Sequence, residues 1–263
     1  MYRMNLALNP SLGAQYKSMS QKARVITESW VEDEMFCPSC DSSSLERLPH
    51  GTKVRDFQCP ECSEQYQCKS LAKDISNRIL DSAYEAMIDA ILKNRLPNLL
   101  ILHYSRSPWE VRDLLLIPRH LLSISAIEKR RPLNPSARRA GWVGCNIIVD
   151  GIPESGRIFV VKDKIPVDPE TVRSEWRQFA FLGRYEPGRR GWIVDVLACI
   201  QSLKRDRFSL HDLYEFEDEL SASHPNNRNI RPKIRQQLQV LRDRGILRFV
   251  APGEYEFPEG RWS

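Results

Sequence analysis

Residues 54–70 have the sequence VRDFQCPECSEQYQCKS. Apolar and polar residues alternate on both sides of a tight Cys-Pro-Glu-Cys turn, which predicts a β-hairpin. Asp56 falls on its first strand, and Gln67 and Lys69 fall on its second. Because side chains alternate across a strand, Gln67 and Lys69 share one face. The hairpin therefore brings an acidic and a basic side chain onto neighbouring strands.

The same hairpin carries one of two CxxC motifs. Cys37-Pro-Ser-Cys40 and Cys59-Pro-Glu-Cys62 are separated by eighteen residues, within the spacing that tetrahedral thiolate sites use. Each tight turn directs two sulfur atoms at one ion about 2.3 Å away, and four thiolates complete the shell of a structural zinc ion. These four cysteines are therefore the predicted zinc ligands, and no coordination position remains for catalysis.

The composition is that of a folded protein. A length of 263 residues favours two domains over one. Hydrophobic residues make up 41% of the chain and charged residues 28%. No run approaches the about eighteen apolar residues of a membrane span, and the N-terminus lacks a signal-peptide pattern. We therefore expect a cytoplasmic protein that does not contact membranes. We also expect it to be a monomer in solution.

Helical and strand patterns are mixed in the first part of the chain. Apolar runs near residues 100 and 115 predict two strands joined as a hairpin or short crossover, and residues 157–164 predict another strand. The combination predicts a mixed-sheet α/β domain. Helical spacing is present in residues 17–30, 77–95, 120–130 and 168–183, the last with Asp168 as N-cap and Pro169 at the first helical position.

A short polar segment with Pro and Gly, residues 184–191, predicts a linker. We therefore expect two domains, 1–185 and 186–263. Three helical segments and a terminal hairpin follow the linker, which is the order of a winged helix-turn-helix domain.

Basic residues form two clusters, which indicates a polyanionic partner. Residues 129–139 hold five basic residues and no acidic one, and residues 226–248 hold seven against a single aspartate. The last helical segment is the candidate recognition helix, because Arg can pair with guanine and Gln with adenine in the major groove. Its predicted DNA contacts are Arg231, Lys233, Arg235, Gln236 and Gln237.

The chain as a whole resembles the DpnI family of methyl-directed, type IIM restriction endonucleases. The blocks that carry the resemblance are SQKARVITESWV, both CxxC motifs, VRDFQCPECSEQYQCKS, RPLNPSARRAGWVGCNI, GRIFVVKD, RGWIVDVLACI and KIRQQLQVLRD. The resemblance implies a PD-(D/E)XK nuclease domain with a zinc element, followed by a winged-helix domain. It also implies hydrolysis of double-stranded DNA at GATC sites whose adenine is N6-methylated.

Carried over by motif, the resemblance makes Asp56 the first ligand of a catalytic Mg²⁺, for which Mn²⁺ is a possible substitute. Gln67 stands at the second ligand position, Cys68 offers its backbone carbonyl, and Lys69 is the catalytic lysine. This assignment describes a metal-dependent type II site-specific deoxyribonuclease.

Gln67 departs from the Asp, Glu, Lys pattern of the family, which has Glu at this position. The departure bears on activity, because an amide oxygen is neutral and a weaker Mg²⁺ ligand than a carboxylate. Two interpretations stay open. Either the chain cleaves DNA, with Glu28 or Glu64 supplying the missing charge, or it is a non-cleaving regulator that binds methylated DNA.

Recognition of an N6-methyl group favours an aromatic ring in the major groove. Trp142, directly after the first basic cluster, is the stronger candidate, and Trp192 is the second. Arg138 and Arg139 beside Trp142 are expected to contact phosphate.

Overall fold

The computed structural model describes residues 4–49 and 55–258. The chain divides into two compact units, each assembled from separate segments. The first contains Met1–Ser76, Arg95–Arg119 and Ser155–Ala180, and the second contains Asn77–Asn94, His120–Glu154 and Phe181–Ser263. In the described part of the chain, no helix has the length and apolar character that crossing a membrane demands.

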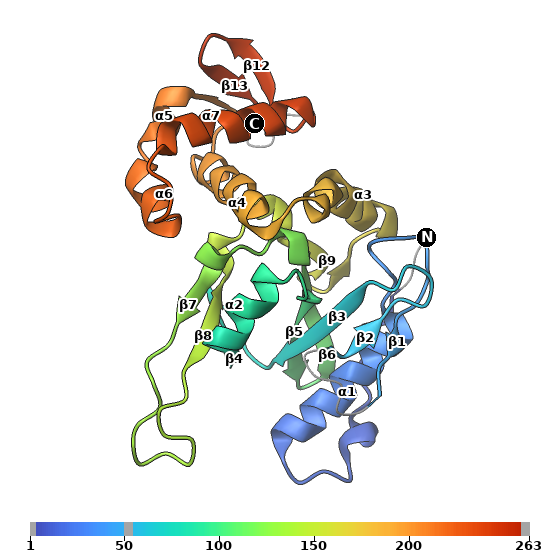
Figure 1. The fold of residues 1–263 in the computed structure, drawn as a ribbon. Coiled ribbons are helices and arrows are strands. Elements are labelled where there is room, and N and C mark those ends of the chain that lie inside the picture. Colours follow the sequence, from blue (N-terminus) through green and yellow to red (C-terminus); the bar gives the residue numbers. More distant parts are fainter. Residues whose placement is uncertain (1–3, 50–54, 259–263) are drawn as a thin grey trace. The chain divides into compact units, whose positions relative to one another are not determined.

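A seven-stranded mixed sheet forms the centre of the first unit (Figure 1). β3 pairs with β5 in parallel, and the other neighbours are antiparallel. In sheet order, the strands are β1 (Glu46–Arg47), β2 (Phe57–Gln58), β3 (Gln65–Leu71), β5 (Asn98–Arg106), β6 (Trp109–Ile117), β9 (Ile158–Lys162) and β10 (Ile165–Pro166).

The predicted strand pair near residues 100 and 115 is confirmed as the β5–β6 hairpin. Leu100 pairs with Leu116 and Leu102 with Leu114, and all four side chains are fully buried. Complete burial of one such side chain stabilises the fold by about 1.5–3 kcal/mol. This hairpin is therefore a rigid support for β3, which pairs with β5.

Two helices contribute to the same core. They are α1 (Met19–Glu34), which contacts β3, and α3 (Pro169–Phe179), which contacts β9. The predicted cap of α3 is confirmed, because the Asp168 carboxylate accepts hydrogen bonds from the backbone N–H groups of Glu170 and Thr171. α1 buries Trp30 and Val31 against the sheet, so its opposite face can carry polar side chains.

The second unit contains a three-stranded sheet in the order β4–β8–β7, together with α2 (Tyr84–Leu92). Its strands are β4 (Arg78–Ala83), β8 (Gly144–Ile148) and β7 (Ile127–Lys129). The predicted helix over 77–95 is therefore wrong in its first part. Ile79 pairs with Ile147 across the sheet, and a partner so distant in sequence outweighs local helical spacing.

The predicted helix over 120–130 is also wrong. That segment forms two 3₁₀ turns, Arg119–Leu121 and Ile124–Ala126, and then β7. Ser123 and Ser125 each donate a hydrogen bond to the buried carboxylate of Asp195, at 2.7 and 2.5 Å. Serine side chains bonded in this way favour turns over a continuous helix.

The C-terminal part has the predicted helices followed by a small sheet. The second predicted helix is divided into α5 and α6 at Glu215 and Phe216, and α5 begins with a capping box made by Ser209 and Asp212. The elements are α4 (Pro187–Ser202), β11 (Arg207–Ser209), α5 (Leu210–Tyr214), α6 (Glu217–Ser223), α7 (Ile230–Asp243), β12 (Arg248–Ala251) and β13 (Glu254–Glu256).

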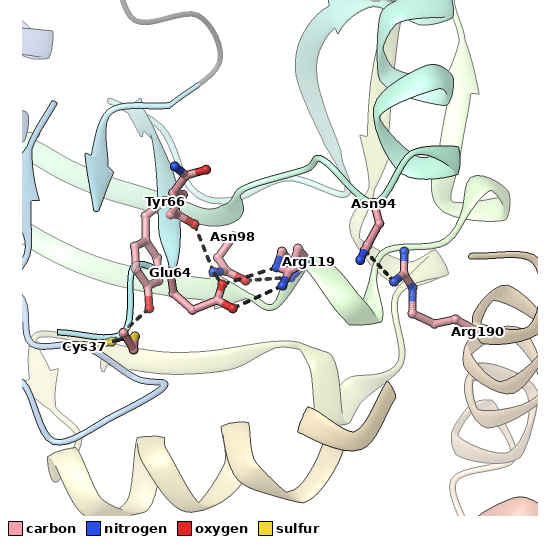
Figure 2. Close-up of polar contacts among 9 residues, drawn as sticks. Cys37, Glu64, Tyr66, Asn94, Asn98, Arg119 and Arg190 are labelled. Carbon is pink, nitrogen blue, oxygen red and sulfur yellow. Dashed lines mark hydrogen bonds and ion pairs between the residues drawn. The ribbon is translucent and has the colours of Figure 1, made fainter. Parts of the chain in front are cut away.

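Helix α4 makes polar contacts with the rest of the second unit. Asp195 also accepts a hydrogen bond from His224 Nε2 at 2.7 Å. Arg190 donates from Nη1 to Asn94 Oδ1 at 2.7 Å (Figure 2). Since Asp195 and Arg190 are both buried, these bonds satisfy charges that would otherwise be costly.

Candidate active site and metal centre

The four cysteines of the two CxxC motifs meet in the first unit. All four sulfur atoms lie within 4.8 Å of one another. The Sγ atoms of Cys37 and Cys62 are 3.6 Å apart, and those of Cys40 and Cys59 are 3.5 Å apart. A tetrahedron with zinc–sulfur bonds of about 2.3 Å has edges of about 3.8 Å. The cluster can therefore hold a zinc ion with little rearrangement.

The protonation of these thiols depends on their surroundings. Burial raises the pKa of the Cys37 thiol well above its usual value and that of Cys62 to about 11. Burial also raises the pKa of Cys59, but hydrogen bonds from the backbone N–H groups of Cys62 and Glu61 and from neighbouring thiols outweigh it and lower the value to about 7. A bound cation favours the thiolate form of every ligand.

Backbone contacts fasten the cluster to neighbouring elements. The N–H of Cys59 donates to the carbonyl of Glu64 at 2.9 Å, which closes the turn before β3. From α3, Arg173 donates to the carbonyls of Cys37 and Ser42 at 3.2 and 3.1 Å. These contacts tie one CxxC turn to the segment before β3 and the other to α3.

The carboxylate of Glu64 belongs to a separate polar network (Figure 2). It accepts from Asn98 Nδ2 at 2.9 Å and from Arg119 Nη2 at 3.2 Å. Arg119 and Asn98 also bond to each other through a backbone N–H at 2.9 Å. Glu64 therefore braces β3 against β5, and its charge is already neutralised there.

Asp56 lies directly before β2, opposite β3. Its backbone N–H donates to the carbonyl of Tyr66 at 2.9 Å, and its Oδ2 accepts from the backbone N–H of Cys68 at 2.8 Å. Gln67 and Lys69 both lie on β3, whose parallel pairing with β5 is regular through this segment. The hairpin predicted from residues 54–70 is thus present in the described residues, although residue 54 itself lies outside them.

A cavity of about 380 Å³ opens beside Asp56. Gln67 and Cys68 line it, so the structure brings the first and second predicted ligand positions together. Lys69 is not among its described lining residues. The full set is Arg24, Thr27, Glu28, Asp56, Gln67, Cys68 and Ser70.

Of the three lining residues on α1, Arg24 and Glu28 form ion pairs in the site. Arg24 Nε lies 2.5 Å from Glu28 Oε1, and Arg24 Nη2 lies 3.5 Å from Asp56 Oδ1. The hydrogen bond to Glu28 raises the pKa of Arg24. In the sequence, Arg24 and Glu28 have the spacing of an ordinary helix surface pair, so only the fold reveals their position beside Asp56.

The first basic cluster lies in the connection between β7 and β8. Backbone hydrogen bonds from Leu133 to the carbonyl of Trp142 and from Gly141 to that of Leu133 close this connection. Arg138 and Arg139 are exposed at its end, and Trp142 is half-buried. The Trp142 ring packs so closely over Gly144 that a side chain there would clash with it at 2.7 Å.

Helix α7 presents the second basic cluster. Arg231 donates from Nε to Glu217 Oε2 at 2.7 Å, and Arg235 donates from Nη1 to the Tyr214 hydroxyl at 2.7 Å. Arg231, Arg235 and Gln236 are exposed, and Lys233 is half-buried. Contacts with the preceding helices thus hold the two arginines in place at the surface.

The structure corrects two members of the predicted DNA-contact set. Gln237 is fully buried and donates to the carbonyl of Lys233 at 3.2 Å, so its amide faces the domain core. Trp192 is 6% exposed and stacks on His224 with ring centroids 3.8 Å apart. Both side chains are core residues, because the buried face of α7 is wider than the apolar stripe that the sequence predicts and α4 is buried along most of its length.

The described residues combine a mixed sheet, a four-cysteine cluster that could hold zinc, a cavity lined by Asp56 and Gln67, and a C-terminal part of helices followed by a small sheet, a combination that suits a DNA-acting protein of the restriction type. Residues 4–185 match the family model described as DpnI, Dam-replacing family, and residues 188–257 match DpnI_C, the Dam-replacing HTH domain. The chain therefore belongs to the DpnI, Dam-replacing family. Membership suggests a methyl-dependent, restriction-like function on DNA and a nuclease activity.

Proposed function

We propose that this protein is a restriction endonuclease that hydrolyses double-stranded DNA at GATC sites carrying N6-methyladenine, with Mg²⁺ as cofactor. The observation that carries the proposal is the cavity that Asp56 and Gln67 line together, with Lys69 two residues further along β3. Oxygen ligands from a carboxylate, an amide and a backbone carbonyl suit a hard divalent cation.

In this mechanism each residue of the strand pair has one task. A bound divalent cation supplies Lewis acidity and lowers the pKa of water. Asp56 is oriented by the Cys68 N–H, which donates to Oδ2, and its other oxygen, Oδ1, faces Arg24 in the structure and would hold the cation once Arg24 moves away. The Gln67 amide oxygen and the Cys68 carbonyl complete the protein's contribution. The ammonium group of Lys69 orients water and offsets the negative charge that develops on the phosphate.

The four-cysteine cluster holds a structural zinc ion in this proposal. A closed thiolate shell offers no position for a reacting water. Because Cys59 begins the turn that leads into β3, the ion fixes the hairpin that carries Asp56 and Lys69. Zinc thus acts on catalysis through the geometry of the strands.

DNA is read by two surfaces. Arg231, Arg235 and Gln236 on α7 offer hydrogen-bond donors for base edges, with Lys233 beside them. Arg138 and Arg139 in the β7–β8 connection contact phosphates, and the Trp142 ring beside them is the candidate contact for the N6-methyl group.

Two observations favour a second function. Gln67 is neutral, and the Arg24 guanidinium lies beside Asp56 where a metal would have to bind. A chain in that state binds methylated DNA without cleaving it and acts as a regulator.

The test uses one plasmid prepared with and without adenine methylation at GATC, incubated with the protein in Mg²⁺ and in Mn²⁺. We expect cleavage of the methylated plasmid alone, and loss of cleavage by about a hundredfold or more in Lys69→Ala, because one charge-stabilising group is typically worth that much. The matched control is Lys73→Ala, an exposed lysine just beyond β3, which should cleave normally. Absence of cleavage in both metals, together with a mobility shift on methylated duplex, would establish the regulator instead.

A further inference from the structure

The cavity beside Asp56 has a second carboxylate that the motif does not include. Glu28 lies on the polar face of α1, whose opposite face is anchored in the core by Trp30. The Glu28 side chain is 13% exposed and that of Asp56 is 17% exposed. Both are therefore held in a partly desolvated position, where a carboxylate needs a cationic partner.

The partner present in the structure is Arg24. Its guanidinium group bonds to Glu28 and also lies 3.5 Å from Asp56, so one cation bridges the two carboxylates. Yet the Arg24 side chain is 56% exposed, far more than either carboxylate. It can leave the site by rotating into solvent, because a long exposed side chain loses little by giving up an ion pair.

We propose that Glu28 supplies the carboxylate ligand that Gln67 cannot, and that Arg24 is an internal cation which the divalent metal must displace. This inference rests on the proposed nuclease function and specifies how its metal site is completed and regulated. Two carboxylates and one amide oxygen around a single cavity give the charge and donor type that a hard cation prefers. Exchange of the guanidinium for the metal keeps the site from carrying two uncompensated negative charges.

Glu64, the other acidic residue near the hairpin, does not fit this role. Its carboxylate already accepts bonds from Asn98 and Arg119, and it is absent from the described lining of the cavity. Recruiting it would break the ion pair between Glu64 and Arg119. Glu28 is thus the acidic side chain that the fold delivers to Gln67.

The test measures cation binding without DNA. Calorimetric titrations of the zinc-loaded, full-length protein with Mg²⁺ and with Ca²⁺ compare the wild type with Glu28→Gln and Arg24→Gln. We expect Glu28→Gln to weaken binding by at least about tenfold, the usual cost of disturbing a metal site. Arg24→Gln should strengthen binding about threefold, since it removes a competitor whose ion pair is worth little.

The matched control is Glu32→Gln, one turn further along α1, where the carboxylate pairs with Arg47 and does not line the cavity. It should bind cations as the wild type does. In the Glu28→Gln background, Gln67→Glu should restore binding, which separates loss of a ligand from loss of folding. Unchanged affinity in Glu28→Gln, or weaker affinity in Arg24→Gln, overturns the inference.

The two proposals fail in different ways. If the wild type binds Mg²⁺ with the expected response to both variants but cuts no DNA, the nuclease proposal is wrong and the cation site stands. If the wild type cuts methylated DNA while Glu28→Gln binds Mg²⁺ normally, this inference is wrong and the nuclease stands.

Discussion

The four-cysteine cluster and the cavity beside Asp56 use the same hairpin, yet they are prepared for a metal in opposite ways. The cysteine sulfurs already lie at separations of 3.5 and 3.6 Å, near the edges of a zinc tetrahedron. In the cavity, the Asp56 carboxylate accepts a hydrogen bond from the Cys68 backbone N–H, and the Glu28 carboxylate forms an ion pair with Arg24. The cysteine cluster thus has its ligand atoms gathered, whereas the carboxylates of the cavity are occupied by the protein's own donors, which on our proposal a cation must displace.

The largest expected effect comes from opening the cluster. Cys62 is exposed, so Cys62→Ala removes a ligand with little loss of packing. Because structural zinc contributes about 10–16 kcal/mol of folding free energy, loss of one ligand should cost about 3 kcal/mol or more. Thermal unfolding with and without a zinc chelator measures it. Glu61→Ala is the control, and equal melting temperatures for the two variants would show that the cluster does not stabilise the fold.

An intermediate effect should follow from Asp56→Asn. The amide can still accept the Cys68 hydrogen bond, so the strands stay paired, but the site loses a negative charge that the proposed metal would require. We expect cleavage of methylated plasmid to fall about a hundredfold or more with the melting temperature nearly unchanged. A parallel loss of stability and activity would mean that Asp56 serves the hairpin rather than the reaction.

The smallest effect should come from Glu64→Gln. This change leaves the Asn98 contact in place and removes a charge partner of Arg119, for an expected loss of about 1–2 kcal/mol in unfolding free energy. Urea denaturation monitored by tryptophan fluorescence measures it, and Mg²⁺ affinity should not change. Weaker Mg²⁺ binding in Glu64→Gln would mean that Glu64, and not Glu28, supplies the second carboxylate ligand.

Local patterns predicted those parts of the molecule whose causes are local. The cap at Asp168, the β5–β6 hairpin and the helices around 192–202 and 230–243 follow from residues close in sequence. The four cysteines could be grouped because thiolate spacing is itself a short-range rule. Asp56 and Gln67 were placed together for the same reason, since one hairpin contains both.

Long-range pairing explains what the sequence could not reveal. Residues 78–83 have apolar residues at helical spacing, and their strand conformation depends on Ile147 and its neighbours in β8. The position of Arg24 beside Asp56 depends on how α1 packs on the sheet. The burial of Gln237 and Trp192 likewise reflects tertiary packing, which charge counts and helical spacing do not contain.

The carboxylate of Asp195 has a consequence for how such proteins can be recombined. It sits on α4, within the part that matches the HTH domain, but two of its three hydrogen bonds come from Ser123 and Ser125, which fall in the part matched by the other family model. A transplanted C-terminal half would carry an acid whose serine donors stayed behind in the parent chain. Exchange between relatives is therefore constrained to halves that preserve this serine–aspartate pairing.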